Sequence, residues 1–317
     1  MQTWRRLGSW ISGHMVFIVP AVVAAGVLFP EHLIPLRPII PALFAVVTFQ
    51  NSLGNTFESI AEVIRKPKTL LVTVALVHVV APVLVRLVAG LLFADAPDTV
   101  VGTVLEACVP VGATTVMWSA VYGGNVALAL TMMFVSTVIA PFTIPWTLRL
   151  LVGASVEVDV VGMMSDMLFM VGIPAVLGVT VNQLSHGWGR ERLSPVMAPL
   201  SSILVPIIIG TNATGISEQM HHLTPRLLAI AAFVGCVTIL SICVGALVAR
   251  AMKQPDDTTV TMMFDCGIRN ISVGAVLAST YLPAESLFPV MVGTLFQQVF
   301  AAIIGRMMQR RMQEDAT

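Results

Sequence analysis

The sequence predicts an all-α polytopic membrane protein with ten transmembrane helices, arranged as two inverted five-helix repeats. Three observations indicate this fold class: an apolar composition, basic residues that fall on one side of the apolar segments, and features that recur half a chain length apart. Apolar residues make up 56% of the 317 positions and charged residues 11%, and the mean hydropathy is +0.90. Soluble domains carry about 25% charged residues, so lipid is the predicted solvent. The net charge of zero gives no reason to expect a nucleic-acid partner.

The N-terminal segment indicates a retained first helix rather than a signal peptide. Arg5 and Arg6 precede an apolar run over 15–29, which is also how a signal peptide begins. The run ends at Pro30 without a small-residue cleavage pattern, and further apolar segments follow at once. We therefore expect this run to cross the membrane.

Nine further apolar segments have the length that a membrane helix needs. A hydrocarbon layer of about 30 Å takes about 20 apolar residues of α-helix. In chain order, the ten predicted spans are 14–30, 36–53, 68–93, 99–121, 124–151, 159–183, 194–214, 222–250, 256–282 and 283–309.

The basic residues between these spans predict the orientation. With the N-terminus inside, twelve lysines and arginines fall in inner segments and three in outer segments. Cytoplasmic loops carry such an excess, and one span more or fewer in the middle of the chain would remove it. We expect a multi-pass protein of a bacterial inner membrane with both termini in the cytoplasm. The inner residues are Arg5, Arg6, Arg65, Lys66, Lys68, Arg190, Arg192, Arg250, Lys253, Arg306, Arg310 and Arg311, and the outer ones are Arg37, Arg149 and Arg226.

A shift of 158 residues, half the chain length, aligns features of the two halves. Five spans per half is an odd number, so the halves 1–155 and 156–317 must have opposite orientations. Inverted repeats are typical of secondary transporters, whose sites lie near the bilayer midplane where helices are interrupted. The aligned features are Pro67-Lys68 with Pro225-Arg226, Pro97-Asp98 with Pro255-Asp256, and Cys108 with Cys266.

The fourth and ninth spans are interrupted at equivalent places, over 108–112 and 266–270. We expect these two broken helices to cross, because irregular backbone at this depth needs surrounding protein or a water-filled cavity. Two ordinary kinks are the alternative, since proline and glycine are common in membrane helices.

Ionisable residues flank both interruptions. Glu106 precedes the first, and Asp265 and Arg269 bracket the second. A lone charge at the bilayer centre costs about 2.5–3.5 kcal/mol on insertion scales, so we expect one or both carboxylates to neutralise Arg269. The group could act as a protonation switch or as a purely structural ion pair. His78, in the third span, is a candidate proton relay or a hydrogen-bonded packing residue.

Polar residues where the broken helices resume predict a binding site for an organic anion. Helix N-termini present free N–H groups and positive dipole ends, which suit a carboxylate or a sulfonate. The predicted substrate-binding residues are Gly112, Thr114, Thr115, Asn270 and Ser272.

Five segments together resemble the bile acid:sodium symporter family, and the resemblance covers about 29–306. It implies a panel domain of helices 1, 2, 6 and 7, at 14–60 and 159–214, and a core domain at 68–151 and 222–309 in which helices 4 and 9 cross. The segments are Lys66-Pro67-Lys68 with Pro82, Cys108-Val109-Pro110-Val111-Gly112, Gly124-Asn125-Val126-Ala127-Leu128, Ser136-Thr137 with Pro141, and Cys266-Gly267-Ile268-Arg269-Asn270.

The sodium ligands that the resemblance implies are mostly replaced in this sequence. The acidic ligand shared by two ions corresponds to Asp265, and backbone carbonyl ligands correspond to Cys266 and Ile268. Arg269 would place a permanent positive charge where a sodium ion lies, and Asp265 is expected to accept from it bidentately. The remaining side-chain ligands correspond to Thr115, Val116, Ala129 and Met133 in one site, and to Val77 and Arg269 in the other.

We therefore expect a secondary transporter that moves a small organic anion by alternating access without sodium, through proton coupling, exchange or facilitated diffusion. The alternatives are a sodium-independent efflux carrier of organic acids and a membrane sensor that binds such an anion. An enzyme is not expected, because no H-E-x-x-H pattern, Ser/His pair or paired aspartates are evident. No metal site is expected, since Cys108, Cys236, Cys243 and Cys266 show no metal-ligand spacing. We also expect a monomer without a cofactor.

Overall fold

The computed structural model describes residues 2–58, 61 and 67–314, and nearly all of them lie in helices or in short turns between helices. The β-pairing recorded within these ranges is one isolated bridge between Val111 and Arg269. The all-α prediction is therefore confirmed for the described chain.

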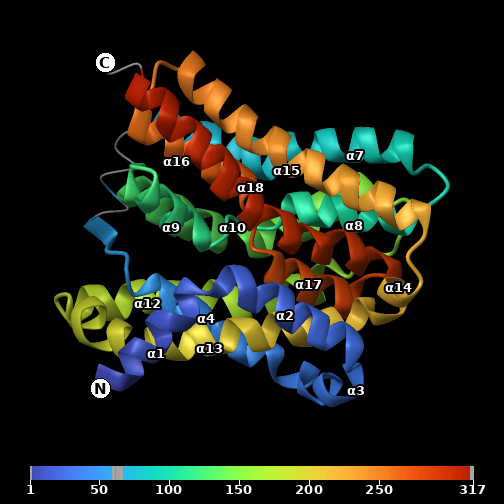
Figure 1. Cartoon of the computed structure of the whole chain (residues 1–317), viewed down its shortest axis with the longest axis horizontal. Helices are drawn as coiled ribbons and strands as arrows, with labels where there is room; N and C mark the ends of the chain where they lie inside the picture. The colour runs from blue at the N-terminus through green and yellow to red at the C-terminus, as the bar shows by residue number, and fades with distance from the viewer. Residues whose placement is uncertain (1, 59–60, 62–66, 315–317) are drawn as a thin grey trace.

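Figure 1 shows the helices in two layers, with α17 (Ile271–Tyr281) lying where the layers meet. The first layer holds α1 (Gln2–Gly13), α2 (Met15–Leu28), α4 (Ile40–Ser52), α12 (Ile173–Leu184) and α13 (Ser194–Ala213). The second holds α7 (Ala81–Leu92), α8 (Pro97–Cys108), α9 (Thr114–Val121), α15 (Pro225–Ala251), α16 (Asp256–Gly267) and α18 (Leu287–Glu314). The other long elements are α6 (Pro67–Ala75) with the π-helical turn η2 (Leu76–Val80), α10 (Val126–Val152), and α11 (Val160–Met167) with η3 (Leu168–Gly172).

Short elements complete the chain at both ends of these helices. They are α3 (Pro30–Leu33), η1 (Ile34–Ile39), η4 (Gly189–Leu193), η5 (Thr214–Ile216), α14 (Ser217–His221) and η6 (Ala284–Ser286).

Among the described residues, seven helical stretches are long and apolar enough to cross a membrane. They coincide with seven of the ten predicted spans, so a polytopic membrane protein is confirmed. The pair α1–α2 counts as an eighth stretch if a bend of 79° is allowed within one span. The predicted spans 99–121 and 256–282 instead appear as the interrupted pairs α8–α9 and α16–α17. The total of ten, the inverted repeat and the panel and core domains stay predictions.

Helix α1 is a correction to the sequence analysis, which placed no helix before residue 14. One face of α1 packs along α13: the Trp4 indole N–H donates to the Val196 carbonyl (2.9 Å), and Ser12 and Ser202 share a hydrogen bond of 2.9 Å. Between them, Gly8 lies so close to Pro199 that a Cβ would come within 2.6 Å of its Cα. Trp4, Gly8 and Ser12 follow one another at intervals of four residues, so the sequence already contained a signal for this helix.

Side-chain caps mark the starts of three helices. Asn125 accepts from Leu128 N–H at the start of α10, Asp159 accepts from Gly162 N–H at the start of α11, and Thr224 accepts from Leu227 N–H at the start of α15. Each cap satisfies a backbone donor that has no partner within its own helix.

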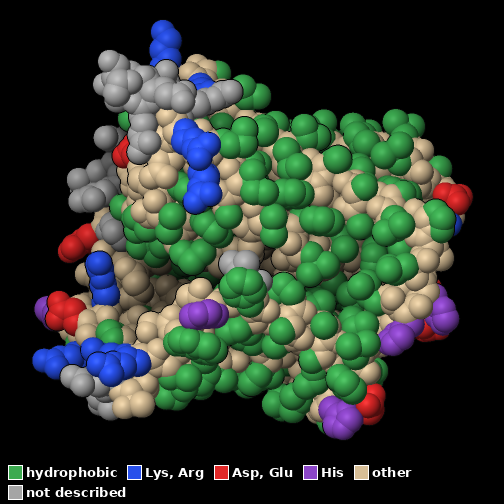
Figure 2. Space-filling view, in the orientation of Figure 1, with side chains coloured by type: hydrophobic (Ala, Val, Ile, Leu, Met, Phe, Trp, Pro, Cys, Tyr) green, Lys and Arg blue, Asp and Glu red, His purple; other side chains and the backbone are tan. Residues whose placement is uncertain are grey.

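Lysine and arginine side chains gather at one end of the molecule, where Figure 2 shows most of the blue surface. Both chain termini lie at the same end in Figure 1. The opposite end carries mainly histidine and acidic side chains on this face of the molecule.

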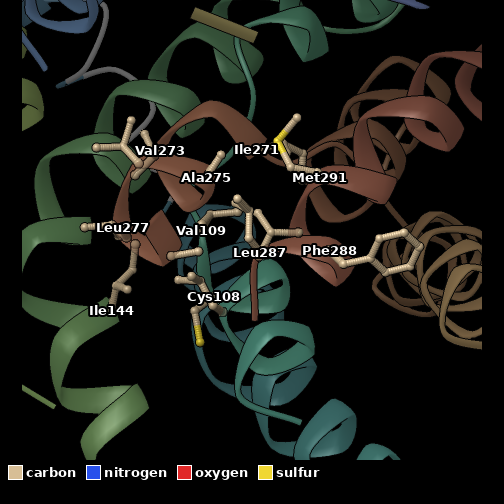
Figure 3. Close-up of a cluster of buried hydrophobic side chains, with 14 of the residues drawn as sticks. Cys108, Val109, Ile144, Ile271, Val273, Ala275, Leu277, Leu287, Phe288 and Met291 are labelled. Carbon is tan, nitrogen blue, oxygen red and sulfur yellow. The ribbon is translucent and has the colours of Figure 1, made fainter. Parts of the chain in front are cut away.

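The largest hydrophobic cluster of the described residues draws on helices of both layers, and Figure 3 shows the part of it around the end of α8. Cys108 and Val109, at the end of α8, meet Ala275 and Leu277 of α17 there. Ile144 of α10 and Leu287, Phe288 and Met291 of α18 complete the labelled part of the cluster. This packing holds the two interruptions in one place.

Candidate functional site

The two helix interruptions lie against one another and exchange backbone hydrogen bonds. Helix α8 ends at Cys108 and Val109 is extended, while α16 ends at Gly267 and Ile268 is extended. Gly112 N–H donates to the Ile268 carbonyl (2.9 Å), and Asn270 N–H donates to the Pro110 carbonyl (2.7 Å). These bonds satisfy backbone groups that no helix can satisfy here.

Gly112 permits the close approach of the two segments. A Cβ at this position would lie 2.9 Å from the Arg269 carbonyl oxygen, which is a rigid backbone neighbour. Gly112 is buried, and its N–H is used in the pairing. Gly112 therefore has a structural role at the crossing, and its contact with the substrate stays a prediction.

His78 and Ser136 support the first interruption. Ser136 Oγ accepts from Val111 N–H (2.9 Å) and lies 2.8 Å from His78 Nε2. His78 Nδ1 lies 3.2 Å from Thr143 Oγ1, so both ring nitrogens have partners. This geometry supports the packing interpretation of His78 in the conformation described. Ser136 was not predicted as a site residue.

The second interruption is held by a glutamine of α18 and by its own arginine. Arg269 N–H donates to Gln297 Oε1 (3.2 Å), and the guanidinium Nη1 donates to the Val77 carbonyl (3.2 Å). The amide nitrogen of Gln297 is buried and has no hydrogen-bond partner among the described residues. Glu106, Arg269, Thr238 and Ser241 line a cavity of about 10 Å³, which is about the size of one water molecule.

The predicted bidentate pair between Asp265 and Arg269 is wrong for this structure. Both carboxylate oxygens of Asp265 are buried and lack a hydrogen-bond partner among the described residues. Glu106 lines the same small cavity as Arg269. The predicted pair does not form because Nη1 of Arg269 is directed to the carbonyl of Val77 rather than to Asp265 in α16. Of the alternatives left open by the sequence, neutralisation by Glu106 is the one that the geometry favours.

Several positions that correspond to sodium ligands pack together in an apolar cluster. Val77 and Cys266 belong to it with exposed fractions of 0% and 3%, together with Met133 at 7%. Val116 packs against the cluster from α9. Ala129, on the same helix as Met133, is fully buried. The side chains of Val77, Met133, Val116 and Ala129 supply no oxygen atoms for a cation, whereas the ligand implied at Cys266 is its backbone carbonyl, which every residue type provides.

The predicted anion-binding residues divide into exposed and buried groups. Thr114, Asn270 and Ser272 are partly exposed where α9 and α17 begin. Asn270 occupies the N-cap position of α17, but its side chain makes no cap hydrogen bond. Thr115 is fully buried, and its hydroxyl donates to the Gly112 carbonyl (2.9 Å). The structure therefore leaves Thr114, Asn270 and Ser272 partly exposed and buries Thr115, and the anion site itself stays a prediction.

Two further contacts involve Gln298, which the sequence analysis did not identify. Its Nε2 donates to Thr114 Oγ1 (3.1 Å), and its Oε1 accepts from the Trp118 indole N–H (2.8 Å). An adjacent pair of glutamines within an apolar span was the available signal, since polar side chains in lipid need partners.

The layers make different contacts at their two ends. At the end away from the basic residues, the Tyr281 hydroxyl of α17 donates to Asp166 of α11, and Leu287 packs against Gly215. At the basic end, Figure 2 shows a hollow between the layers, and Met117 and Val121 of α9 are exposed.

Within the described chain, no group of three His, Cys, Asp or Glu side chains could hold a metal ion.

Comparison with known proteins decides the family. A model of the Sodium Bile acid symporter family matches residues 41–223, more than half of the chain. The chain belongs to this family. Its members are membrane transporters, so the resemblance stated from the motifs is confirmed.

The family relatives include bacterial and plant proteins. Uncharacterized protein YbaS of Bacillus subtilis is 34% identical over 93% of this chain and 97% of its own length. The uncharacterized sodium-dependent transporter YocS of the same organism is 21% identical over 97% of this chain and 92% of its own. A rice chloroplast protein, the probable sodium/metabolite cotransporter BASS2, is 25% identical over 71% of this chain and 53% of its own length.

Proposed function

We propose that this member of the family transports a small organic anion, a carboxylate or a sulfonate, without coupling to sodium. The observation that carries the proposal is the chemistry at the crossing. Val77 and Met133, with Val116 packed against them, belong to an apolar cluster at positions where the resemblance implies side-chain sodium ligands. The Arg269 guanidinium donates to the Val77 carbonyl at the same place. A fixed cation there replaces the charge that a bound ion would supply.

The charge balance supports a tethered cation. Arg269 is 6% exposed and Glu106 is 3% exposed, so neither charge is compensated by bulk water. Both side chains line one small cavity, and their mutual attraction offsets part of the cost of burying them. A sodium ion would add a second positive charge beside the guanidinium, which Coulomb repulsion disfavours.

The polar groups at the starts of α9 and α17 support an anionic substrate. Helix N-termini carry free N–H groups and a partial positive charge. Thr114, Asn270 and Ser272 add partly exposed polar side chains at these two starts.

Alternating access is the proposed mechanism of movement. The arrangement supports it because the layers are in contact through Tyr281 and Asp166 at one end and leave a hollow at the other. In this proposal the fold has ten spans in two inverted repeats, the panel (14–60 and 159–214) rocks against the core (68–151 and 222–309), and the described conformation opens toward the basic end. Following the positive-inside rule, that end faces the cytoplasm of a bacterial inner membrane. We expect the monomer to be the transporting unit.

The proposal differs from what the names of two relatives state, since YocS and BASS2 are described as sodium-dependent or sodium/metabolite transporters. Those names belong to those proteins. The family itself indicates sodium/metabolite transport, and the present chain is proposed to have lost the sodium component through the substitutions around Arg269.

Accumulation of a labelled anion in proteoliposomes tests the proposal. A screen of choline salts of carboxylates and sulfonates by thermal shift first selects an anion that binds. The protein is then reconstituted, and uptake of this labelled anion is measured against liposomes without protein. Uptake supports transport, whereas binding with no uptake in any imposed gradient would indicate a sensor. Loading the vesicles and measuring release separates an efflux carrier from an importer.

A further inference from the structure

Helix α1 is an element that neither the crossing nor the proposed anion site uses. Its axis is bent by 79° from that of α2, so it does not continue α2 in a straight line across the bilayer. One of its faces is occupied by α13, through the contacts of Trp4, Gly8 and Ser12. Most side chains on its other faces are exposed.

The exposed surface of α1 has a basic side and an apolar side. Arg5, Arg6 and Ser9 lie within one turn of each other on the first side, and all three are exposed. Leu7 and Trp10, three residues apart, form the second side with exposed fractions of 43% and 57%. Helices with arginine on one side and leucine and tryptophan on another are typical of the boundary between lipid and water.

A second pair of arginines lies at the same corner of the molecule. The Trp4 indole donates to the Val196 carbonyl, which places the start of α1 beside the start of α13. The turn η4 directly precedes α13 and carries Arg190 and Arg192, both exposed. Figure 2 shows lysine and arginine side chains gathered at the corner where Figure 1 marks the N-terminus. Four arginines from two elements therefore form one basic group.

This basic group has an excess of positive charge. Glu191 is the acidic residue within η4, and the ion pairs recorded among the described residues involve none of the four arginines. A guanidinium group matches the geometry of phosphate oxygens and binds two of them at once. Trp188, directly before η4, is 52% exposed and adds a second aromatic side chain to the corner.

An anionic phospholipid satisfies both sides of this surface. A soluble acidic partner would pair with the arginines but would leave Leu7 and Trp10 in water. A phospholipid brings a phosphate to the basic side and acyl chains to the apolar side. Because the chain is a polytopic membrane protein, lipid is already its neighbour at this corner.

We propose that α1 and η4 form a binding site for the headgroups of anionic phospholipids in the leaflet at the basic end. In the orientation proposed above, this leaflet is the inner one. The arginines bind the phosphate oxygens, and Leu7 and Trp10 enter the acyl region. Because α1 packs along α13, a bound lipid tethers the first layer of helices to the membrane surface. The inference does not depend on which anion is transported.

The second layer provides a matched control. Arg306 and Arg310 of α18 are also exposed arginines near the end of a helix. Two aspartates, Asp256 and Asp257, begin α16 only a few residues after Lys253 in this layer. Variants of Arg306 and Arg310 therefore test whether any exposed arginine pair has the same effect.

Melting temperatures in a neutral detergent, measured with added lipid, test the proposal. Dioleoylphosphatidylglycerol should raise the melting temperature of the unmodified protein more than dioleoylphosphatidylcholine does. In Arg5→Gln/Arg6→Gln and in Arg190→Gln/Arg192→Gln, the phosphatidylglycerol concentration for half of this shift should rise by about tenfold or more. Arg5→Lys/Arg6→Lys should retain most of the response, because the charge is kept, and so should Arg306→Gln/Arg310→Gln. Melting temperatures without lipid show that each variant is folded.

Fluorescence quenching tests the apolar side independently. Phosphatidylglycerol with brominated acyl chains quenches tryptophans that contact it, and part of this quenching should be absent in Trp10→Phe.

Four results would overturn the inference. One is an equal shift with phosphatidylcholine, and another is the same shift with inorganic phosphate, which would indicate a site for a soluble anion. The third is an equal loss of response in Arg306→Gln/Arg310→Gln, which would indicate unspecific attraction by charge. The fourth is unchanged quenching in Trp10→Phe. A failure of anion transport would leave all of these measurements intact.

Discussion

The two interruptions at the crossing have the same backbone geometry and different chemistry. Each donates one N–H to a carbonyl of the other, from Gly112 to Ile268 and from Asn270 to Pro110. The first is supported by uncharged partners, Ser136 and His78. The second carries the buried charge of Arg269, which has Gln297 as a partner and Glu106 nearby.

This difference separates two requirements that the sequence presents together. The paired backbone is what makes a broken helix stable in the membrane, and it needs only small residues and hydrogen-bond partners. The charge is not needed for that purpose, because the first interruption does without it. We infer that Arg269 serves the function of the site, as a replacement for a bound cation.

The largest expected effect comes from removing the charge at the second interruption. Arg269→Met should lower the free energy of unfolding by about 3–5 kcal/mol, since Glu106 is left buried without compensation. Adding Glu106→Gln should recover part of that loss, while adding Asp265→Asn should recover none. Melting temperatures of the singles and doubles in detergent measure both couplings. Recovery with Asp265→Asn alone would restore the pair that the sequence predicted.

A smaller loss is expected from closing the space between the interruptions. Gly112→Ala places a Cβ 2.9 Å from the Arg269 carbonyl oxygen, so the segments must separate. We expect a cost of about 1–3 kcal/mol, as for other overpacked positions. Gly13→Ala is the control, because its added Cβ meets nothing within 4 Å. Chemical denaturation of the two variants compares them, and equal stability would mean that the crossing is loose.

Removing the uncharged partner of the first interruption should lower the free energy of unfolding by a similar or smaller amount. Ser136→Ala leaves the Val111 N–H and a His78 nitrogen without this partner, at about 1–3 kcal/mol for an unsatisfied buried group. Ser279→Ala is the matched control, since Ser279 is exposed and bonds only within its own helix. Hydrogen exchange at Val111 reports the site directly. Unchanged exchange there would remove Ser136 from the account.

The smallest effect should appear when sodium ligands are restored. The double variant Val77→Gln/Arg269→Gln removes the fixed cation and adds two amide oxygens near Asp265, where the resemblance implies glutamine ligands. At a sodium concentration equal to the dissociation constant, binding would stabilise the folded protein by about 0.4 kcal/mol. The unmodified protein should show the same melting temperature in sodium and choline chloride. A sodium-dependent shift in the unmodified protein, and none in the variant, would reverse this interpretation.

The helices and their interruptions could be predicted from the sequence because local features determine them. Pro110 and Gly112 fall close together at one point of a span and the equivalent point of the second half is also interrupted, and the apolar segments have the length that lipid requires. The positions of Thr114, Asn270 and Ser272 followed from the same breaks. Helix α1 was missed because its twelve residues are too polar to count as a span, although Trp4, Gly8 and Ser12 share one face.

The partners of the site residues could not be predicted because they depend on rotamers and on distant helices. The sequence offers Arg269 two candidate partners, Glu106 and Asp265, on different helices. Only the fold shows that its guanidinium donates to the Val77 carbonyl and that Asp265 makes no hydrogen bond to it. Thr114 and Thr115 are adjacent, and only the helix phase of α9 decides that the second is fully buried. Gln297 and Gln298 lie about 180 residues from Thr114 and Trp118, so no local pattern connects them.

The most direct test of the central claim measures whether sodium ions enter together with the transported anion. Proteoliposomes containing the unmodified protein are given the labelled anion together with radioactive sodium, and uptake of both is measured at an imposed anion gradient, with choline replacing sodium in a parallel series. The account predicts equal anion uptake in the two series and no sodium uptake above that of liposomes without protein. Anion uptake that requires sodium, with sodium entering in a fixed ratio to the anion, would contradict the role given to Arg269.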